Sequence, residues 1–317
     1  MSQEIGKAPR IGVTPANDLF RRIWRYRALY LMIIPCLVFF AVFAYVPMGG
    51  LVLAFKDYKF NKGILGSPWV GLKYFETFFG NYQAFELIRN TLVIGAIKVI
   101  IEFPFPIVLA LMLNEVKSAR YKKLTQTISY LPNFLSWVIL VTMMQRLLAP
   151  NTGLLNQIIG QLGGSDGTFF MMQENAFYPI VFFSDLWKNI GWNSIIFLAA
   201  ISGIDPALYE AARIDGCRKF QEILHITLPS LRPTIGILFI MGLGGLISSG
   251  FDQIYLLRTP GNMALADTLD VYIIRMGLTG GQYGYATAVG LIQGIVSLIL
   301  VVTANKISAK VTEVSIW

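Results

Sequence analysis

The segment EAARIDGCRKFQEILHITLP, residues 210–229, is a polar, helix-prone stretch between two long apolar runs, and it decides how the chain is organised. Just before it, Asp205 is a typical helix N-cap, and Pro206 occupies the first helical position, where proline is tolerated. Within it, Gly216 is typical of a helix stop, because glycine adopts the left-handed conformation without strain. We therefore predict a helical hairpin over residues 205–229.

The rest of the chain has the composition of a membrane protein. Its 317 residues are 55% hydrophobic and 14% charged, with a mean hydropathy of +0.59, whereas soluble domains carry about 25% charged residues. Charged residues are absent from four long runs, residues 28–55, 124–145, 233–251 and 276–305. Since a helix needs about 20 residues to cross about 30 Å of hydrocarbon, the chain is expected to cross a membrane several times.

We predict an all-α membrane protein with six transmembrane helices. The expected spans are residues 28–55, 91–113, 124–147, 177–202, 230–256 and 283–304. The second and fourth spans contain charged residues, Lys98 with Glu102 and Asp185 with Lys188, but each lies within an otherwise apolar helical length. The chain accordingly divides into an N-terminal segment, a membrane domain and a short tail, which are residues 1–27, 28–304 and 305–317.

The basic residues predict the orientation. Sixteen lysines and arginines flank the spans on the side of the two termini and the hairpin, and seven lie on the other side. Because an excess of Lys and Arg marks the cytoplasmic side, both termini and the hairpin are predicted to be cytoplasmic. The outer loop 56–90 is rich in aromatic side chains, which suits either the headgroup level of the membrane or a docking surface for an external partner.

Other classes of protein are disfavoured. The net charge of +8 is gathered beside the apolar runs and not in a stripe with stacking aromatics, which argues against nucleic-acid binding. Cys36 and Cys217 should lie at different depths, so no disulfide is expected, and His225 has no partner residues for a metal site. An intramembrane enzyme using Asp185 or Asp252 would lack a second positioned catalytic group, so no catalytic residue is predicted. An ion channel or a proton-driven carrier would have no use for the hairpin.

The hairpin resembles the EAA signature of permease subunits of binding-protein-dependent ABC importers, the MetI-like family. The matching residues are Glu210-Ala211-Ala212, Gly216 and Ile226-x-Leu228-Pro229, at the spacing of that signature. Residues 130–138 and 191–196 resemble segments of the sugar and polysaccharide branch of the family, the LplB type. Cys217 replaces the commoner alanine and keeps a small side chain.

The resemblance implies a role and a set of partners. The hairpin would enter a groove on a cytosolic ATPase through Glu210, Ala211, Ala212, Asp215, Gly216, Ile226, Leu228 and Pro229. This chain has no GxxxxGK[ST] loop, so two separate ATP-binding subunits would use ATP and Mg, and this chain would bind no cofactor. The branch also implies a second permease of different sequence, an external solute-binding protein, an oligosaccharide substrate and a bacterial cell membrane. The alternative is a permease for another solute, such as peptides.

The shape of the hairpin can be predicted in more detail. The first helix should cover about residues 207–215 and the second about 218–226, with Pro229 beginning the next span. Small side chains and a glycine bend would let two short helices act as one rigid unit against a partner. An amphipathic helix lying on the membrane surface is the alternative, but it does not explain the fixed separation of Glu210 and Gly216.

Two polar stripes mark a candidate substrate path. On the fourth span, one helical face carries Asp185, Lys188, Asn189 and Trp192. A tryptophan ring packs on the face of a pyranose, and neighbouring polar groups bind its hydroxyls, so this face suits a sugar. On the fifth span a similar spacing carries small and polar residues, namely Gly242, Gly245, Ser249 and Asp252. If Lys188 is unpaired in an open cavity, acidic sugars would be favoured.

A structural interpretation of the same residues stays open. Asp185 with Lys188, and Lys98 with Glu102, have the spacing of ion pairs within a helix, which would lie at the interface between two permeases. The glycines of the fifth span would then be close-packing positions.

Overall fold

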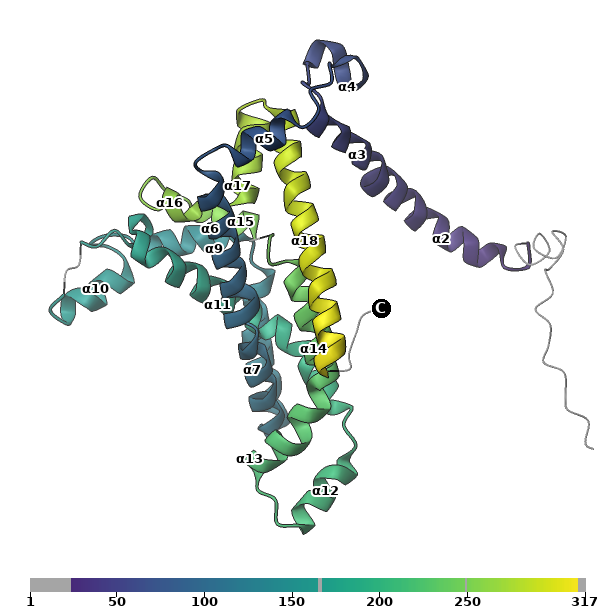
Figure 1. The fold of residues 1–317 in the computed structure, drawn as a ribbon. Helices are drawn as coiled ribbons and strands as arrows, with labels where there is room; N and C mark the ends of the chain where they lie inside the picture. The colour runs from purple at the N-terminus through teal and green to yellow at the C-terminus, as the bar shows by residue number, and fades with distance from the viewer. Residues whose placement is uncertain (1–23, 165–166, 249, 313–317) are drawn as a thin grey trace, which may run out of the picture. The chain divides into compact units, whose positions relative to one another are not determined.

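The computed structural model describes residues 24–164, 167–248 and 250–312, which fall into two compact units, residues 1–52 and 53–317 (Figure 1). Within the described residues the structure is helical and contains no β-strand, only two isolated β-bridges, Lys56 with Trp69 and Lys59 with Gly63. The expected all-α architecture is therefore confirmed.

The first unit contains an apolar helical length that agrees with the first predicted span. It consists of α2 (Arg27–Phe40), a π-helical turn η1 (Ala41–Tyr45) and α3 (Val46–Met48), and it continues through the 3-10 turn η2 (Gly49–Phe55). The whole length, Arg27–Phe55, is long and apolar enough to cross a membrane. Its side chains are largely exposed in the structure, as suits contact with lipid. Of the predicted N-terminal segment, residues 1–23 lie outside the described part.

Three helices of the second unit are long and apolar enough to cross a membrane. They are Ala84–Glu115, Lys219–Gly244 and Tyr283–Lys306. The first consists of α6 (Ala84–Ala96), the π-helical turn η4 (Ile97–Ile101) and α7 (Pro104–Glu115), and the last belongs to α18 (Tyr283–Thr312). Two bent helix pairs bring the possible number of spans in the described chain from four to six. The predicted spans 91–113 and 283–304 lie within helices.

The third predicted span, residues 124–147, is wrong as a single straight helix. The chain forms α8 (Ala119–Tyr130), a 3-10 turn η5 (Leu131–Phe134) and α9 (Trp137–Leu147), with a bend of 100° between Ala119–Phe134 and Trp137–Leu147. Pro132 interrupts the helical hydrogen bonds at this bend. Ser136 then starts α9 as an N-cap, because its hydroxyl accepts a hydrogen bond of 3.3 Å from the Ile139 amide.

The fifth predicted span, residues 230–256, is also interrupted. Its helix α14 (Leu228–Gly244) ends in a glycine-rich stretch, and α15 (Phe251–Leu257) starts separately. Gly250 precedes α15 with a φ of 77°, a conformation that glycine adopts without strain. Residues on both sides of this break are apolar, and for this reason the sequence predicted one continuous helix.

The fourth predicted span, residues 177–202, corresponds to α11 (Glu174–Ser202). At its end the chain bends by 69° into α12 (Pro206–Ile214), the first arm of the hairpin. A separate second helix was predicted for residues 218–226, and this prediction is wrong. Instead, α13 (Lys219–Glu222) and the π-helical turn η7 (Ile223–Thr227) run directly into α14. Pro229 lies in the first turn of α14, where its missing N–H is tolerated.

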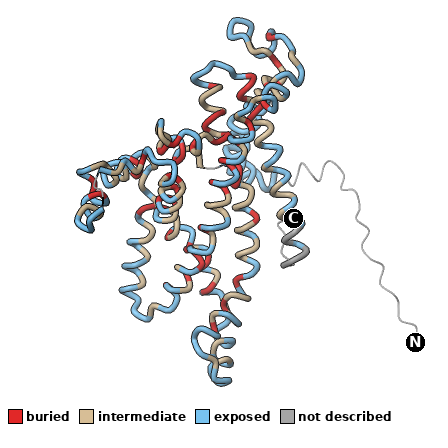
Figure 2. The backbone as a smooth tube through the Cα atoms, turned by 60° about the vertical axis from the view of Figure 1, so that its left-hand side comes forward, coloured by how far each residue is buried: buried red, intermediate tan, exposed pale blue. Residues whose placement is uncertain are grey.

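Short helices lie in the connections between the long helices of the second unit. They are η3 (Phe60–Lys62), α4 (Gly63–Gly66), α5 (Lys73–Phe79), α10 (Leu154–Gln161), η6 (Phe170–Met172), α16 (Met263–Ala266), α17 (Leu269–Ile274) and η8 (Arg275–Thr279). Buried residues gather where the long helices cross, and the hairpin is mostly exposed (Figure 2). One buried apolar cluster, comprising Ile107, Ala110, Phe197, Ile201 and Leu231, joins α7, α11 and α14. These three helices position both candidate sites.

Candidate functional site

The first arm of the hairpin is capped at both ends, as its sequence predicted. The Asp205 carboxylate accepts a hydrogen bond of 2.9 Å from the Ala207 amide, and Pro206 occupies the first helical position. At the other end Gly216 has a φ of 78°, and the Cys217 amide donates to the Ala212 carbonyl at 2.9 Å. The predicted N-cap and glycine stop are both confirmed.

The predicted coupling residues divide into two groups by exposure. Glu210, Ala211, Asp215 and Gly216 are exposed on the first arm and the turn. The other four, Ala212, Ile226, Leu228 and Pro229, are partly buried. The first group is therefore available to a partner, and the second group lies against the rest of the chain.

The hairpin also exposes apolar side chains, one of which sequence analysis missed. Ile214 is 87% exposed and Phe220 is 70% exposed, at the tips of the two arms. Both side chains are therefore accessible on the surface of the hairpin. Ile214 could have been found from its apolar character between Arg213 and Asp215.

An ion-pair network that was not predicted joins the two arms. Arg213 on α12 donates to the Glu222 carboxylate at 2.9 Å, and Lys219 lies 3.6 Å from the same carboxylate. The side chain of Glu222 is only 5% exposed. The hydrogen bond to Glu222 raises the pKa of the Arg213 guanidinium, so this pair stays charged at physiological pH. A hydrogen bond of 3.0 Å between the Tyr209 and Thr227 hydroxyls joins the arms a second time.

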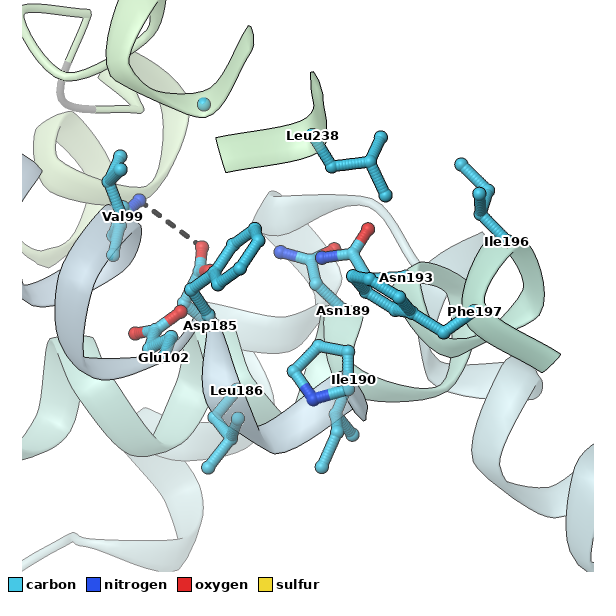
Figure 3. Close-up of a pocket in the computed structure, with 14 residues that line it drawn as sticks. Val99, Glu102, Asp185, Leu186, Asn189, Ile190, Asn193, Ile196, Phe197 and Leu238 are labelled. Carbon is cyan, nitrogen blue, oxygen red and sulfur yellow. Dashed lines mark ion pairs between the residues drawn. The ribbon is translucent and has the colours of Figure 1, made fainter. Parts of the chain in front are cut away.

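A second candidate site is a cavity of about 340 Å³ between η4 and α7, α11, and α14 (Figure 3). Its polar wall contains Lys98, Glu102, Asp185, Asn189 and Asn193. The last three are four residues apart along α11, so they share one face of that helix. Its apolar wall includes Phe103, Phe197 and Leu238. Asn193 and the two phenylalanines were missed by sequence analysis, although Asn193 continues the spacing of Asp185 and Asn189.

The charged groups of the cavity pair across helices. Lys98 lies 3.2 Å from the Asp185 carboxylate, and both side chains are largely buried. The π-helical turn η4 contains Lys98, and such turns often lie at functional sites because they redirect side chains. Glu102 is only 7% exposed, and its Oε1 atom has no hydrogen-bond partner among the residues described. The salt bridge of Lys98 with Asp185 thus links η4 to α11. The structural interpretation had expected ion pairs within one helix, Lys98 with Glu102 and Asp185 with Lys188.

Lys188 and Trp192 belong to a different region from Asp185 and Asn189. The Lys188 ammonium donates to the Asn133 carbonyl at 2.7 Å and to the Leu135 carbonyl, at the bend between α8 and α9. Trp192 is 47% exposed and contacts the ring of Phe134 edge-on. Neither residue lines the cavity. Lys188 is bound to backbone carbonyls, so the condition for favouring acidic sugars, an unpaired lysine in the cavity, is not met.

Asn189 connects these two regions. Its side-chain oxygen accepts a hydrogen bond of 3.1 Å from the Asn133 amide group, and it also lines the cavity. One face of α11 therefore serves both the helix bend and the cavity.

The predicted stripe on the fifth span does not form one helical face. Gly242 lines the cavity, but Gly245 follows the end of α14, and Asp252 is exposed in the first turn of the separate helix α15. Ser249 lies outside the described residues. The break between α14 and α15 separates residues that a continuous helix would have aligned.

Two other chemical possibilities can be examined in the described part of the chain. It contains no group of three or more His, Cys, Asp or Glu side chains that could hold a metal ion. Cys36 and Cys217 are both free thiols. Neither observation adds a further chemical site to the hairpin and the cavity.

Comparison with known proteins supports a transport role. The chain is 44% identical over 299 residues to the polygalacturonan/rhamnogalacturonan transport system permease protein YteP of Bacillus subtilis (strain 168), covering 94% of this chain and 93% of that protein. It is 42% identical over 286 residues to protein LplB of the same organism, covering 90% of each.

Solved structures share the same fold. A bacterial ABC transporter involved in the import of the acidic polysaccharide alginate contains a chain that matches with a TM-score of 0.86 and 40% identity, covering 93% of this chain and 99% of that chain. A bacterial alginate ABC transporter in complex with an alginate pentasaccharide-bound periplasmic protein matches equally well, over 94% and 99% of the two chains. The MetI-like permease fold expected from the hairpin is therefore confirmed.

Residues 102–312 match the family described as the binding-protein-dependent transport system inner membrane component. This range contains the hairpin and most of the cavity wall. Members are permease subunits and not enzymes, and ATP hydrolysis is carried out by a separate subunit. The chain belongs to this family of inner membrane transport components.

Proposed function

We propose that this chain is one permease of an ABC importer that carries oligosaccharides derived from polysaccharides across a bacterial cell membrane. The observation that carries the substrate class is the cavity lined by η4, α7, α11 and α14. Its lining offers carboxylate and amide groups to sugar hydroxyls, and it offers Phe103, Phe197 and Leu238 to the C–H face of a pyranose ring. Cavities that combine an apolar lining with a few placed polar groups are typical small-molecule sites. The named substrates of the similar proteins, polygalacturonan, rhamnogalacturonan and alginate, support the same class.

The substrate path of this proposal runs along α11. Asp185, Asn189 and Asn193 would contact the sugar, and Lys98 would hold the Asp185 carboxylate in place through its salt bridge of 3.2 Å. Because Lys188 and Trp192 act at the bend of α8 and α9, we assign them a positioning role. The second wall of the path would come from the partner permease.

The second part of the proposal concerns energy coupling. The exposed surface of the hairpin, with Glu210, Gly216 and the apolar tips Ile214 and Phe220, would dock into a groove on a cytosolic ATPase. Two such ATP-binding subunits, using ATP and Mg, would drive the change of access. A second permease and an external solute-binding protein would complete the assembly, with both termini of this chain in the cytoplasm.

Uptake by the reconstituted complex tests the substrate class. The complex of this chain with its neighbouring permease, ATPase and binding protein is placed in proteoliposomes, and uptake of labelled oligosaccharides and peptides is measured. We expect ATP-dependent uptake of an oligosaccharide and a loss of at least about tenfold in Asn189→Leu, because two buried hydrogen bonds to a substrate are each worth about 1 kcal/mol. Asn61→Leu, on the exposed turn η3, is the matched control. Uptake of peptides with no uptake of any oligosaccharide would contradict the proposal.

A further inference from the structure

The helix Ala84–Glu115 reaches the hairpin through a side chain at its last residue. Glu115 ends α7, and its carboxylate lies 3.1 Å from the ammonium of Lys219, the first residue of α13. Lys219 also lies 3.6 Å from Glu222, which in turn binds Arg213 of α12 at 2.9 Å. Four residues, Glu115, Lys219, Glu222 and Arg213, thus form a continuous chain of ion pairs, named here the relay. The relay joins three helices.

The helix at the end of the relay, α7, is not adjacent to the hairpin along the chain. The first arm of the hairpin follows α11 along the chain, and the second arm continues into α14. Movement of the hairpin therefore reaches α11 and α14 through the backbone. Helix α7 lies elsewhere in the sequence, and residues 116–118 lead from it into α8. The Lys219–Glu115 pair supplies a direct polar contact between α7 and the second arm, in addition to the apolar packing of α7 on α11 and α14.

The same helix carries one wall of the cavity. Lys98 and Glu102 lie on the helical length Ala84–Glu115, and Lys98 is paired with Asp185 on α11 at 3.2 Å. Helix α7 also packs along α11. The helical length Ala84–Glu115 thus makes one ion pair at the hairpin, from α7, and one at the cavity, from η4, beside the packing of α7 on α11.

The exposure of the relay side chains indicates which of them stabilise the fold and which are free to transmit movement. The side chains of Lys219 and Glu115 are 60% and 39% exposed, and exposed pairs add little to folding stability. Glu222 differs, since only 5% of its side chain is exposed and two cations surround it. Glu222 therefore anchors the relay within the hairpin, and the pair of Lys219 with Glu115 extends the relay to α7.

We propose that the Lys219–Glu115 pair transmits movement of the hairpin to the helix Ala84–Glu115, so that the cavity wall on that helix follows the ATPase together with α11 and α14. This inference rests on the proposed coupling of the hairpin to an ATPase. Lys219 and Glu115 act as positioning residues, because neither touches the substrate. Loss of this pair leaves the hairpin docked on the ATPase, but part of the hairpin's movement no longer reaches the helix Ala84–Glu115.

The test is a double-mutant cycle on the reconstituted importer. Glu115→Gln, Lys219→Gln and the double variant are compared for oligosaccharide transported per ATP hydrolysed. Each single variant lowers this ratio by about two- to fivefold, the range that exposed ion pairs contribute. The double variant is no worse than Lys219→Gln alone, which also loses the contact of Lys219 with Glu222. Lys219→Arg, which keeps the charge, retains the wild-type ratio.

The chain offers a matched control pair. Lys59 and Asp57 in the outer loop are also 3.1 Å apart, with side chains 53% and 40% exposed. The same cycle on Asp57→Asn and Lys59→Gln leaves the transport ratio unchanged. Because the Lys219–Glu115 pair is equally exposed, all variants are expected to keep the melting temperature of the complex within a few degrees.

The outcomes separate this inference from the proposed function. Additive losses in the cycle, or an unchanged ratio in the single variants, overturn the relay. Gly216→Asp is measured in the same assay as a reference for the docking of the hairpin. If Gly216→Asp transports normally, the proposed coupling of the hairpin to an ATPase is wrong. If Gly216→Asp loses transport but the losses in the double-mutant cycle are additive, only the relay is refuted.

Discussion

The hairpin and the cavity are two sites of the same three helices, but they depend on different kinds of interaction. The hairpin is held by local interactions, since its cap, its glycine turn and the Arg213–Glu222 pair all lie within residues 205–229. The cavity depends on contacts between residues far apart in sequence, such as Lys98 with Asp185. Local interactions leave a pattern in the sequence, and distant ones do not. The predictions below test whether the two sites can be disturbed independently.

The largest expected effect is on transport, from Gly216→Asp. A side chain at a φ of 78° is strained, and left-handed backbone costs about 1–2 kcal/mol for a residue other than glycine. An added carboxylate also lies on the exposed surface that is proposed to dock on the ATPase. We expect transport to be almost abolished while the chain still inserts in the membrane, measured as uptake and as the amount of purified complex.

Gly163 is the matched control for this substitution. It has a φ of 86° and open space where a Cβ would be added, as Gly216 does, but it follows α10, outside the hairpin. Gly163→Asp therefore introduces the same backbone strain away from the hairpin. Equal loss of transport in both variants would show that strain alone, and not the docking surface, explains the effect.

The next effect is on stability, from Asp185→Asn in the cavity. The substitution leaves the Lys98 ammonium without its carboxylate at a largely buried position, and breaking one partner of such a pair costs about 3–5 kcal/mol. We expect a lower melting temperature of the purified protein in detergent. The double variant Lys98→Met/Asp185→Leu removes both charges and should recover most of the loss. A double variant less stable than Asp185→Asn would contradict the assignment of this pair.

Lys188→Met tests the bend between α8 and α9. It frees the carbonyls of Asn133 and Leu135, and hydrogen bonds from a charged group are worth about 2 kcal/mol. We expect faster amide hydrogen exchange over residues 131–139 and an equal loss of uptake for neutral and acidic oligosaccharides. Lys123→Met, on an exposed part of α8, is the control. A selective loss for acidic oligosaccharides would place Lys188 in the substrate path instead.

The smallest effect is expected from Asp205→Ala at the start of the hairpin. Loss of an N-cap hydrogen bond costs about 1 kcal/mol, so residues 206–214 should exchange amide hydrogen faster while the cavity is unaffected. Ser118 occupies the N-cap position of α8 without making a side-chain cap hydrogen bond. Ser118→Ala should therefore leave exchange in α8 unchanged, and an equal effect of the two substitutions would contradict the cap assignment.

The same contrast explains how much was predictable. Asp205, Pro206 and Gly216 were read correctly because capping and turn preferences belong to single residues and their nearest neighbours. The bend after Pro132 was missed, because the run of uncharged residues continued through it. Pro132 permits the bend, but the contact that holds it is tertiary, since Lys188 of another helix binds the carbonyls of Asn133 and Leu135.

The candidate path was only half predicted for a similar reason. Helical spacing placed Asp185 and Asn189 on one face, and both line the cavity. It placed Lys188 on that face too, because a period of 3.6 residues does not reveal which neighbouring helix a side chain meets. The cross-helix pair of Lys98 with Asp185 depends on how η4 packs beside α11, which no local pattern encodes.

The most direct test of the account is where the tip of the hairpin lies. In a chain carrying Cys36→Ser and Cys217→Ala, a single cysteine is introduced as Ile214→Cys, at a position that is 87% exposed. We expect this cysteine to cross-link to the ATPase subunit in the assembled complex and to resist membrane-impermeant maleimide added to intact cells. Labelling from outside the cell, or no cross-link to any ATPase, would contradict it.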